Sequence, residues 1–385
     1  MSKGKKIKII ISIAAISFIQ GLQYCVSPVL GQIQEHYPDV DVSLIQMLIT
    51  APALLSILVA LLSGWLVLKI SKKKLLLFGS LIAGVTGFLP LLADSFGLLF
   101  FSRTFYGVGL GLATALNTAV VAEFFEGDER VSVMGIQAAS VGAGMVVVTT
   151  VGGMLGSGGF RNAYFINVIG FISMILIACC LPETGKAQAS ESEKIELNKE
   201  VFKISALGAL EFLFLITFTT NIAMHLSGAL KGNTAVSGNL TGIFSGSQIV
   251  VGLILGFITK ITKKYTLPVA MLSFSVGGLI LILFPSNLIM LMIGAVFCGF
   301  SQGMFIPQAM VDVAGAVKPV ATAMASACFT CAMCFGQLVS PTILNTVSKV
   351  VFGEVSTTNV YIISVIGMTA VAVITIIMKR RKENI

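Results

Sequence analysis

Charged residues are scarce in this sequence: only 11% of its 385 residues are Asp, Glu, Lys or Arg, whereas 56% are hydrophobic. An average soluble domain carries about 25% charged residues, so this scarcity and the mean hydropathy of +0.97 exclude an ordinary water-soluble protein. A helix that crosses the hydrocarbon core of a bilayer needs about 20 apolar residues, and the apolar content suffices for about twelve such helices. The composition therefore predicts an all-α membrane protein.

Histidine is rarer still, since the chain contains only His36 and His225. No H-E-x-x-H motif and no pairing of a nucleophile with a base is present, so we expect neither enzyme activity nor a cofactor. All seven cysteines lie in apolar runs, which argues against a disulfide framework. Cys328, Cys331 and Cys334 have the spacing of metal ligands, but no further Cys or His is near them in the run. We interpret them as small packing residues and expect no metal.

The long apolar runs form two sets of six, the first between residues 7 and 181 and the second between residues 204 and 378. Between the sets lies a segment rich in Glu and Lys, which a bilayer core would not accept without partners. The sequence therefore predicts twelve transmembrane helices as two pseudo-symmetric six-helix bundles, residues 1–182 and 204–385, joined by a cytoplasmic linker at residues 183–203. The first run is too long for the apolar part of a signal peptide, so we expect no such peptide.

Lysine and arginine are unevenly distributed over the loops. If the N-terminus is cytoplasmic, most of the 25 basic residues face the cytoplasm, and the outer loops hold only Arg161, Lys231 and Lys349. The positive-inside rule then predicts a multi-pass protein of the cell membrane with both termini in the cytoplasm. This bias accounts for the net charge of +8, so we expect the lipid bilayer and no nucleic acid as a partner.

The two halves repeat one another at an offset of 192 residues. Gly107 and Gly111 form a GxxxG in the fourth apolar run, and Gly299 and Gly303 form another in the tenth. A single GxxxG indicates only close helix packing, but a glycine in the fifth and one in the eleventh run keep the same offset. A duplicated six-helix unit with a linker is typical of secondary transporters, whose substrate site lies between the repeats near the midplane of the membrane.

Four motifs resemble those of the major facilitator superfamily and occur in that family's order. Residues 64–73, GWLVLKISKK, follow G-x-L-a-D-R-x-G-R-R, with Leu68 in place of the acid and Ser71 in place of the second glycine. Residues 103–109, RTFYGVG, match R-x-x-x-G-x-G, residues 159–165, GFRNAYF, resemble G-W-R-x-x-F, and residues 181–184 are LPET. The resemblance implies the twelve-helix transporter fold of this family and a small-molecule substrate.

Only two charged residues lie clearly inside the apolar runs, Arg103 and Glu211. A charge within the membrane is costly and is by default a candidate functional residue. The family motif favours a buried role for Arg103 in proton coupling or substrate contact, and the alternative is that it snorkels outward or bonds to carbonyl groups and organises the first half. Glu211 could load and release a proton, because a low dielectric favours the neutral carboxyl group; the alternative is an acid that only packs between helices.

Acidic residues at the ends of two equivalent runs are candidates for a gate. Glu123 ends the fourth run and Asp312 ends the tenth, at the level of the Lys-rich loops. A pair that exists in only one conformation biases the equilibrium between conformations. We expect gating ion pairs of these two acids with lysines of the loops that follow the second and eighth runs; the alternative is a solvated charged rim. The candidate lysines are Lys69, Lys72 and Lys73 after the second run and Lys260, Lys263 and Lys264 after the eighth.

Uncharged polar residues in the runs are the candidates for substrate contact. Gln20, Gln23 and Tyr24 share one helix face, and first-helix residues line the cavity in the family that the chain resembles. The other candidates are Asn117, Gln137, Asn221, Gln248, Gln302 and Gln337. Hydrogen bonds between helices would also explain any one of them.

A cavity with one Arg and one Glu among many apolar residues suits an amphipathic or weakly charged solute better than a dianion. We therefore expect a monomeric secondary active transporter that uses alternating access, with a proton as the coupling ion and efflux of amphipathic compounds as the direction. The alternatives are uptake of a sugar or organic acid, and a membrane sensor that does not transport.

Overall fold

The computed structural model describes residues 3–184, 197–318 and 321–381, and within these ranges it contains helices and no strand. Eleven helical stretches in the described ranges are long and apolar enough to cross a membrane. One of them, 50 residues long, consists of α11 (Thr234–Thr262) and α12 (Thr266–Leu283), which the short η6 (Lys263–Tyr265) separates. Counted as two crossings, it brings the total to the predicted twelve. The all-α membrane fold is therefore confirmed.

The chain forms two compact units. The first contains the chain up to Val40 and again from Leu48 to the end of the sixth crossing, whereas Asp41–Met47 belong to the second unit. Most of the predicted linker, residues 185–196, lies outside the described residues. The helices of this part of the chain are α1 (Lys3–Gly21), η1 (Leu22–Tyr24), η2 (Ser27–Val29), α2 (Leu30–His36), α3 (Val42–Thr50), α4 (Pro52–Lys69), α5 (Lys72–Phe88), η3 (Leu89–Leu91), α6 (Phe96–Phe124), α7 (Gly127–Gly156), η4 (Phe160–Asn167) and α8 (Val168–Cys180).

The second unit is built from the remaining helices. These are α9 (Lys199–Leu215), α10 (Thr217–His225), η5 (Gly228–Leu230), α11, η6, α12, α13 (Leu288–Gly315), α14 (Thr322–Phe352) and α15 (Thr357–Arg381).

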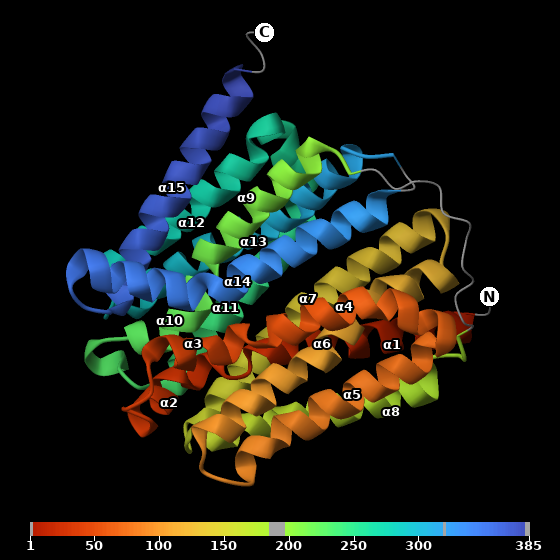
Figure 1. Ribbon diagram of the computed structural model, residues 1–385, viewed down its shortest axis with the longest axis horizontal. Helices are drawn as coiled ribbons and strands as arrows, with labels where there is room; N and C mark the ends of the chain where they lie inside the picture. Colours follow the sequence, from red (N-terminus) through yellow and green to blue (C-terminus); the bar gives the residue numbers. More distant parts are fainter. Residues whose placement is uncertain (1–2, 185–196, 319–320, 382–385) are drawn as a thin grey trace. The chain divides into compact units, whose positions relative to one another are not determined.

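Corresponding helices have corresponding neighbours in the two units (Figure 1). In the first unit α6 packs against α4 and α5, α1 packs against α7 and α8, and α5 packs against α8. In the second unit α13 packs against α11 and α12, α9 packs against α14 and α15, and α12 packs against α15. Each unit is thus a six-helix bundle with the same internal order.

The repeated glycines explain why these pairs of helices approach so closely. A Cβ atom on Gly107 would lie 2.2 Å from the carbonyl oxygen of Pro52, and one on Gly299 would lie 2.2 Å from that of Phe244. Pro52 and Phe244 are themselves 192 residues apart. Only glycine allows such an approach of two backbones, so the GxxxG motifs perform the same packing task in both bundles.

The first and seventh crossings are not single helices, although each apolar run predicts one. The α-helix α1 ends at Gly21, and two 3-10 turns lead to α2, while α9 ends at Leu215 and α10 begins at Thr217. The second crossing is divided in the same way between Thr50 and Pro52. Each division frees backbone carbonyl groups that need other partners.

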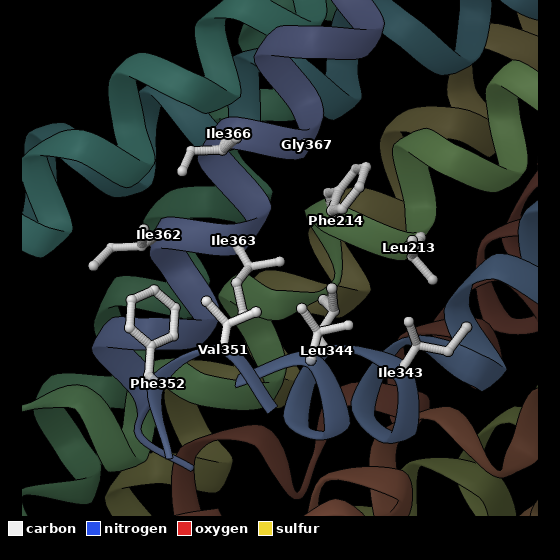
Figure 2. Close-up of a pocket in the computed structure, with 11 residues that line it drawn as sticks. Leu213, Phe214, Ile343, Leu344, Val351, Phe352, Ile362, Ile363, Ile366 and Gly367 are labelled. Carbon is white, nitrogen blue, oxygen red and sulfur yellow. The ribbon is translucent and has the colours of Figure 1, made fainter. Parts of the chain in front are cut away.

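An apolar groove lies within the second unit, where α9, α14 and α15 meet (Figure 2). Its volume is about 370 Å³. Its eleven lining residues are Leu213, Phe214, Ile343, Leu344, Val347, Val351, Phe352, Ile362, Ile363, Ile366 and Gly367.

Candidate functional site

Arg103 of α6 lies under the break in the first crossing and is 1% exposed. Its Nε donates to the carbonyl oxygen of Leu48 at 3.0 Å, and its Nη2 donates to those of Gln23 and Leu22. Its Nη1 lies 3.5 Å from the Sγ of Cys25, which also belongs to the break. The guanidinium group therefore satisfies carbonyl groups that the interrupted helices cannot pair themselves.

Tyr106 follows Arg103 by one helical turn and contacts the same break in the first crossing. Its hydroxyl group donates to the carbonyl oxygen of Ile19, and its ring lies 5.0 Å from the guanidinium carbon of Arg103. The R-x-x-x-G-x-G motif thus supplies a cation and an aromatic ring to this break, while its glycines allow close packing against Pro52 of α4 and Gly79 of α5. The sequence indicated the buried cation and left bonds to carbonyl groups as one of two alternatives, and the structure shows such bonds.

The three predicted substrate contacts of the first crossing differ in their surroundings. Gln23 is buried, and its Nε2 donates to the carbonyl oxygen of Ile49 at 3.2 Å. Tyr24 is also buried. The Nε2 atom of Gln20 is buried without a hydrogen-bond partner among the described residues. Because α1 ends at Gly21, the three side chains do not share the face of one continuous α-helix, and that expectation was wrong.

Ser17 joins two further candidates to α1. Its hydroxyl group accepts a hydrogen bond of 2.9 Å from Asn117 of α6 and lies 3.3 Å from the carbonyl oxygen of Gln137 in α7. The Gln137 side chain donates to Thr118 at 3.3 Å. The structure thus brings Asn117 and Gln137 to one junction, where the Oδ1 atom of Asn117 has no partner within the described part of the chain.

Glu211 lies in α9, a little more than one turn before the break at Ile216, and is 0% exposed. Neither of its carboxyl oxygens has a hydrogen-bond partner among the residues that the structure describes. Burying an unpaired polar group is costly, and burying an unpaired charge is far more so. An acid in this position is therefore suited to binding a proton.

Asn221 of α10 belongs to a buried chain of amides. Its Oδ1 atom accepts a 2.8 Å hydrogen bond from Gln46 of α3, and Gln46 accepts one of 2.8 Å from Asn345 of α14. Asn345 also donates to Ser43 at 3.1 Å. All four residues belong to the second unit. The sequence analysis selected Asn221 but missed Gln46 and Asn345, although both are amides within apolar runs and carried the same signal.

The three remaining glutamines lie on the other long helices of the second unit. Gln302 of α13 and Gln337 of α14 are buried, and Gln248 of α11 is half-buried. The Nε2 atoms of Gln248 and Gln337 are buried and lack partners within the described ranges. These free donors could bind a polar solute or water.

One end of the first unit concentrates the residues predicted to gate. Glu123 pairs with Lys72 at 2.7 Å. Lys69 instead lies 3.9 Å above the ring of Trp65, and the Nζ atom of Lys73 donates to the carbonyl oxygens of Ala178 and Leu181, at the end of α8. A lysine at a helix C-terminus is favoured by the helix dipole. Of Lys69, Lys72 and Lys73, Lys72 is therefore the partner of Glu123.

Two of the motifs meet at this end of the bundle. Ser71 donates to Glu183 at 3.0 Å, and the backbone N–H of Lys73 donates to the Thr184 hydroxyl group at 2.9 Å. The L-P-E-T sequence thus fixes the loop between α4 and α5, and this contact does not use the position where Leu68 replaces the family's acid.

The equivalent residues of the second unit do not form such a pair. Asp312 accepts a hydrogen bond of 2.7 Å from Gln308, one turn earlier in α13. Lys263 ends α11 with a φ of +48°, which is rare for a residue other than glycine. Within the described residues no ion pair joins Asp312 to Lys263.

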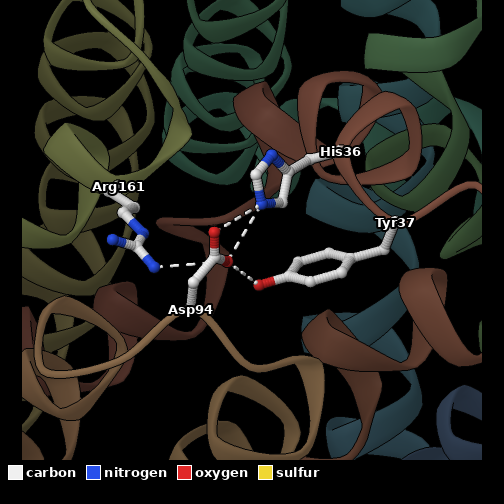
Figure 3. A network of polar contacts seen from close by, with 4 residues as sticks. All are labelled: His36, Tyr37, Asp94 and Arg161. Carbon is white, nitrogen blue, oxygen red and sulfur yellow. Dashed lines mark hydrogen bonds and ion pairs between the residues drawn. The ribbon is translucent and has the colours of Figure 1, made fainter.

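The loops at the other end of the first unit form a polar cluster that the sequence did not indicate (Figure 3). Asp94 accepts hydrogen bonds from the Tyr37 hydroxyl group at 2.6 Å, lies 2.9 Å from the Nε2 of His36 and pairs with Arg161 at 3.2 Å. The hydrogen bonds from Tyr37 and His36 lower the pKa of Asp94. Partial burial and the nearby Asp94 raise the pKa of Tyr37 to about 12.

Comparisons with known proteins agree with this architecture. The family model for the Major Facilitator Superfamily matches residues 11–219 and 204–384. A riboflavin transporter, RibZ of Clostridioides difficile (strain 630), is 27% identical over 206 residues, which is 53% of this chain and 42% of the relative. The chain therefore matches less than half the length of that protein.

Several solved structures share the fold. A mutant of the nucleoside transporter NupG has a TM-score of 0.79 at 15% identity, over 96% of this chain and 99% of that one. A bacterial homologue of the human lysosomal transporter Spinster has a TM-score of 0.71 at 15% identity, over 98% and 96% of the two chains. The POT family transporter PepTSo has a TM-score of 0.78 at 11% identity, over 100% and 99%. At these identities the likeness is one of fold alone.

Proposed function

The chain belongs to the Major Facilitator Superfamily, and we propose that it is a proton-coupled transporter that exports a small amphipathic solute from the cell. As a member of this family it is a multi-pass membrane protein and a secondary transporter, in a superfamily of transporters rather than enzymes. The proton, the cargo and the direction are the proposed parts.

The burial of Glu211 is the observation that carries the proposal. Its two oxygens lack partners among the described residues, and no cation of the described part of the chain pairs with it. In this conformation the protonated form is favoured, because ionising an unpaired carboxyl group there would be costly. In a conformation that admits water the same group would release its proton, which is the requirement for coupling.

The neighbouring break gives Glu211 a place where the helix can change shape. The α9 helix ends at Leu215, and the hydroxyl groups of Thr217 and Ser340 satisfy the carbonyl oxygens of Phe214 and Leu213. A junction held by side chains can rearrange without breaking a continuous helix ladder. We therefore assign the coupling role to Glu211 rather than to Glu123 or Asp312.

Arg103 takes in this proposal the alternative role that the sequence left open, which is to organise the first half. Its hydrogen bonds to Leu22, Gln23 and Leu48 commit the guanidinium group to the backbone of the first and second crossings. We assign it the task of holding the break in the first crossing in shape, so that Gln20 and the other polar residues nearby are positioned for the solute.

The proposed cargo follows from which buried polar groups lack a hydrogen-bond partner. Among the described residues Arg103 is the only basic Lys or Arg side chain that is buried, and it is already occupied, so no buried cation is free for a dianion. Free amide groups on Gln20, Gln248 and Gln337 suit an uncharged polar group on an otherwise apolar compound. Uptake of a sugar or organic acid is the alternative. The partial likeness to a riboflavin transporter makes riboflavin the first compound to test.

The ion pair between Glu123 and Lys72 and the loop around Lys69 and Lys73 are proposed to belong to a cytoplasmic gate. Asp312 and Lys263 would act at the equivalent end of the second unit, in a monomer with both termini in the cytoplasm. This orientation can be tested by placing single cysteines in the α4–α5 loop and treating whole cells with an impermeant thiol reagent. Labelling from outside the cell would reverse the assigned orientation.

Proteoliposomes test the transport proposal directly. An imposed pH gradient should drive accumulation of riboflavin or another amphipathic compound of a panel, above the level in protein-free vesicles, and collapse of the gradient with an ionophore should abolish it. Accumulation that ignores the pH gradient would refute proton coupling, and accumulation of sugars or organic acids alone would select the alternative cargo.

A further inference from the structure

The groove between α9, α14 and α15 has a buried floor and exposed walls. Phe214 and Leu344 form the floor and are 9% and 2% exposed, whereas Val351 and Ile366 on the walls are each 64% exposed. The side chains of Figure 2 surround an open space rather than fill it. The groove is therefore open sideways, toward the surroundings of the helices.

No polar side chain lines the groove. The two carbonyl groups that the end of α9 would expose at its floor already have partners, because Ser340 donates to Leu213 at 2.6 Å and Thr217 donates to Phe214 at 2.5 Å. A polar solute would find no hydrogen bond here, so binding it would cost its own desolvation. The groove is suited to hydrocarbon.

Two glycines shape the two ends of the groove. Gly353, with a φ of +80°, ends α14 in a left-handed turn, and α14 and α15 diverge from that turn (Figure 1). At the far end of the groove, Gly367 lets the ring of Phe214 approach α15, since a Cβ atom there would lie 2.3 Å from the ring. The groove therefore has the form of a wedge, and the backbone at the turn, rather than the position of one side chain, sets this form.

The length of the wedge matches one leaflet of a bilayer. Its α14 wall runs from Ile343 to Phe352, and its α15 wall reaches Gly367, ten residues after the start of that helix at Thr357. At 1.5 Å per residue the wedge is about 15 Å long, which is half the thickness of a hydrocarbon core of about 30 Å.

We propose that this wedge is a binding site for one acyl chain of a membrane phospholipid. An apolar cavity of about 150 Å³ already accommodates benzene, so a volume of about 370 Å³ holds a longer run of methylene groups. A gap inside the membrane cannot remain empty without losing the contacts of its lining atoms. The site depends only on the membrane fold, so its test is independent of transport.

Native mass spectrometry of the full chain, titrated with dioleoyl phosphatidylcholine, measures this binding. Val347→Trp fills the wedge from α14, and Ile363→Trp fills it from α15. Each should weaken retention of the most tightly bound lipid about twofold or more, because the excluded chain loses several atomic contacts, each of which is individually weak. Val350→Trp is the matched control, since Val350 lies at the same depth but outside the groove and is 79% exposed.

Chain length distinguishes the acyl chain from the headgroup. Dihexanoyl phosphatidylcholine has the same headgroup but shorter chains, and it should bind the wild-type protein about twofold more weakly or less well still, because it makes fewer contacts along the wedge. Size-exclusion profiles identify any variant that does not fold, and the two filling variants serve as replacements for one another. Equal retention by the filling variants and Val350→Trp, or equal binding of the long and short lipids, would overturn the proposal.

Discussion

Gln46 donates a hydrogen bond of 2.8 Å from its Nε2 to the Oδ1 of Asn221, and both side chains are 1% exposed. Its own oxygen accepts from Asn345, so both ends of one amide are used in the second unit. A single side chain therefore holds α10 and α14 to the beginning of α3. In a fold whose other helix contacts are mainly apolar, this is a specific connection.

Replacing Gln46 should weaken the second unit. Gln46→Ala leaves the Asn221 oxygen and an N–H of Asn345 without this partner, and each orphaned buried group costs about 1–3 kcal/mol. Ser43→Ala, which removes only the 3.1 Å bond to Asn345, should cost less. Thermal unfolding of the purified variants measures the order. If the two variants were equally stable, the bridge through Gln46 would contribute nothing.

The glycine contacts predict a contrast between two Gly→Ala variants. Gly299→Ala places a Cβ atom 2.2 Å from the Phe244 carbonyl oxygen and should separate α11 from α13, with a loss of about 1–3 kcal/mol or more. Gly252→Ala, on α11 with nothing within 4 Å, should be neutral or stabilising by up to about 1 kcal/mol. Thermal unfolding of both variants checks this. A stable Gly299→Ala protein would show that the helices can adjust.

The packing task of these same glycines could be predicted from the sequence. The offset of Gly299 from Gly107 predicted a shared packing task because backbone contact depends on small size, which is visible in the residue type. The breaks after Gly21 and Leu215 were not visible, since both lie in runs that are apolar on either side. Proline was an inconsistent guide, because Pro28 and Pro52 lie at helix breaks whereas Pro307 and Pro341 lie inside continuous helices.

The candidate site was predicted in its residues more than in its contacts. Buried polar groups such as Asn117, Asn221 and Glu211 stand out in an apolar run, so the sequence selected them. Their partners depend on which helices are neighbours and which face each presents. For that reason only the structure revealed the amide Gln46 and identified which carbonyl groups Arg103 binds.

The loop cluster around Asp94 should make stability depend on pH. Hydrogen bonds from Tyr37 and His36 hold the pKa of Asp94 below its ordinary value, so the cluster stabilises the folded protein above the ordinary carboxyl range. That contribution is lost as the pH falls through the lowered pKa. Thermal unfolding midpoints measured from about pH 3 to 7 should therefore fall more steeply for the wild type than for Asp94→Asn.

The same cluster predicts an effect at alkaline pH. The pKa of Tyr37 is raised from 10.0 to about 12, so its neutral form stabilises the fold fully below 10.0, and this contribution is lost as the pH rises toward 12. Tyr37→Phe should lack this alkaline loss.

Asp39→Asn, in the exposed loop that follows Tyr37, is the control for the loss of stability predicted at acid pH. Identical pH profiles for Asp94→Asn, Asp39→Asn and the wild type would contradict the assignment.

Two substitutions of Arg103 separate positioning from charge. Arg103→Lys keeps the cation but not the forked donors, and Arg103→Ala loses both. If Arg103 holds the helix break, both variants should lose stability, because each orphaned carbonyl costs about 1–3 kcal/mol, and both should lose transport. Proteoliposome uptake and thermal unfolding measure the two effects. Full transport by Arg103→Lys would instead indicate that only the charge is needed.

Glu211→Gln tests the coupling role, because glutamine keeps the shape of the side chain but cannot ionise. The variant should lose accumulation driven by a pH gradient, whereas exchange of labelled for unlabelled substrate, which needs no net proton movement, should continue at a rate close to that of the wild type. Asp39→Asn, at an exposed loop acid outside the proposed gate, is the control and should still accumulate substrate.

The two assays on Glu211→Gln must be read together. Loss of accumulation alone would also follow from a misfolded protein, but such a protein could not exchange substrate. Exchange that persists while accumulation is lost therefore assigns the proton to Glu211, since the solute pathway is then intact and only the coupling is missing. If accumulation persisted in the Gln variant, the proton would be carried elsewhere, and Asp312, which Gln308 holds at 2.7 Å, would be the next acid to replace.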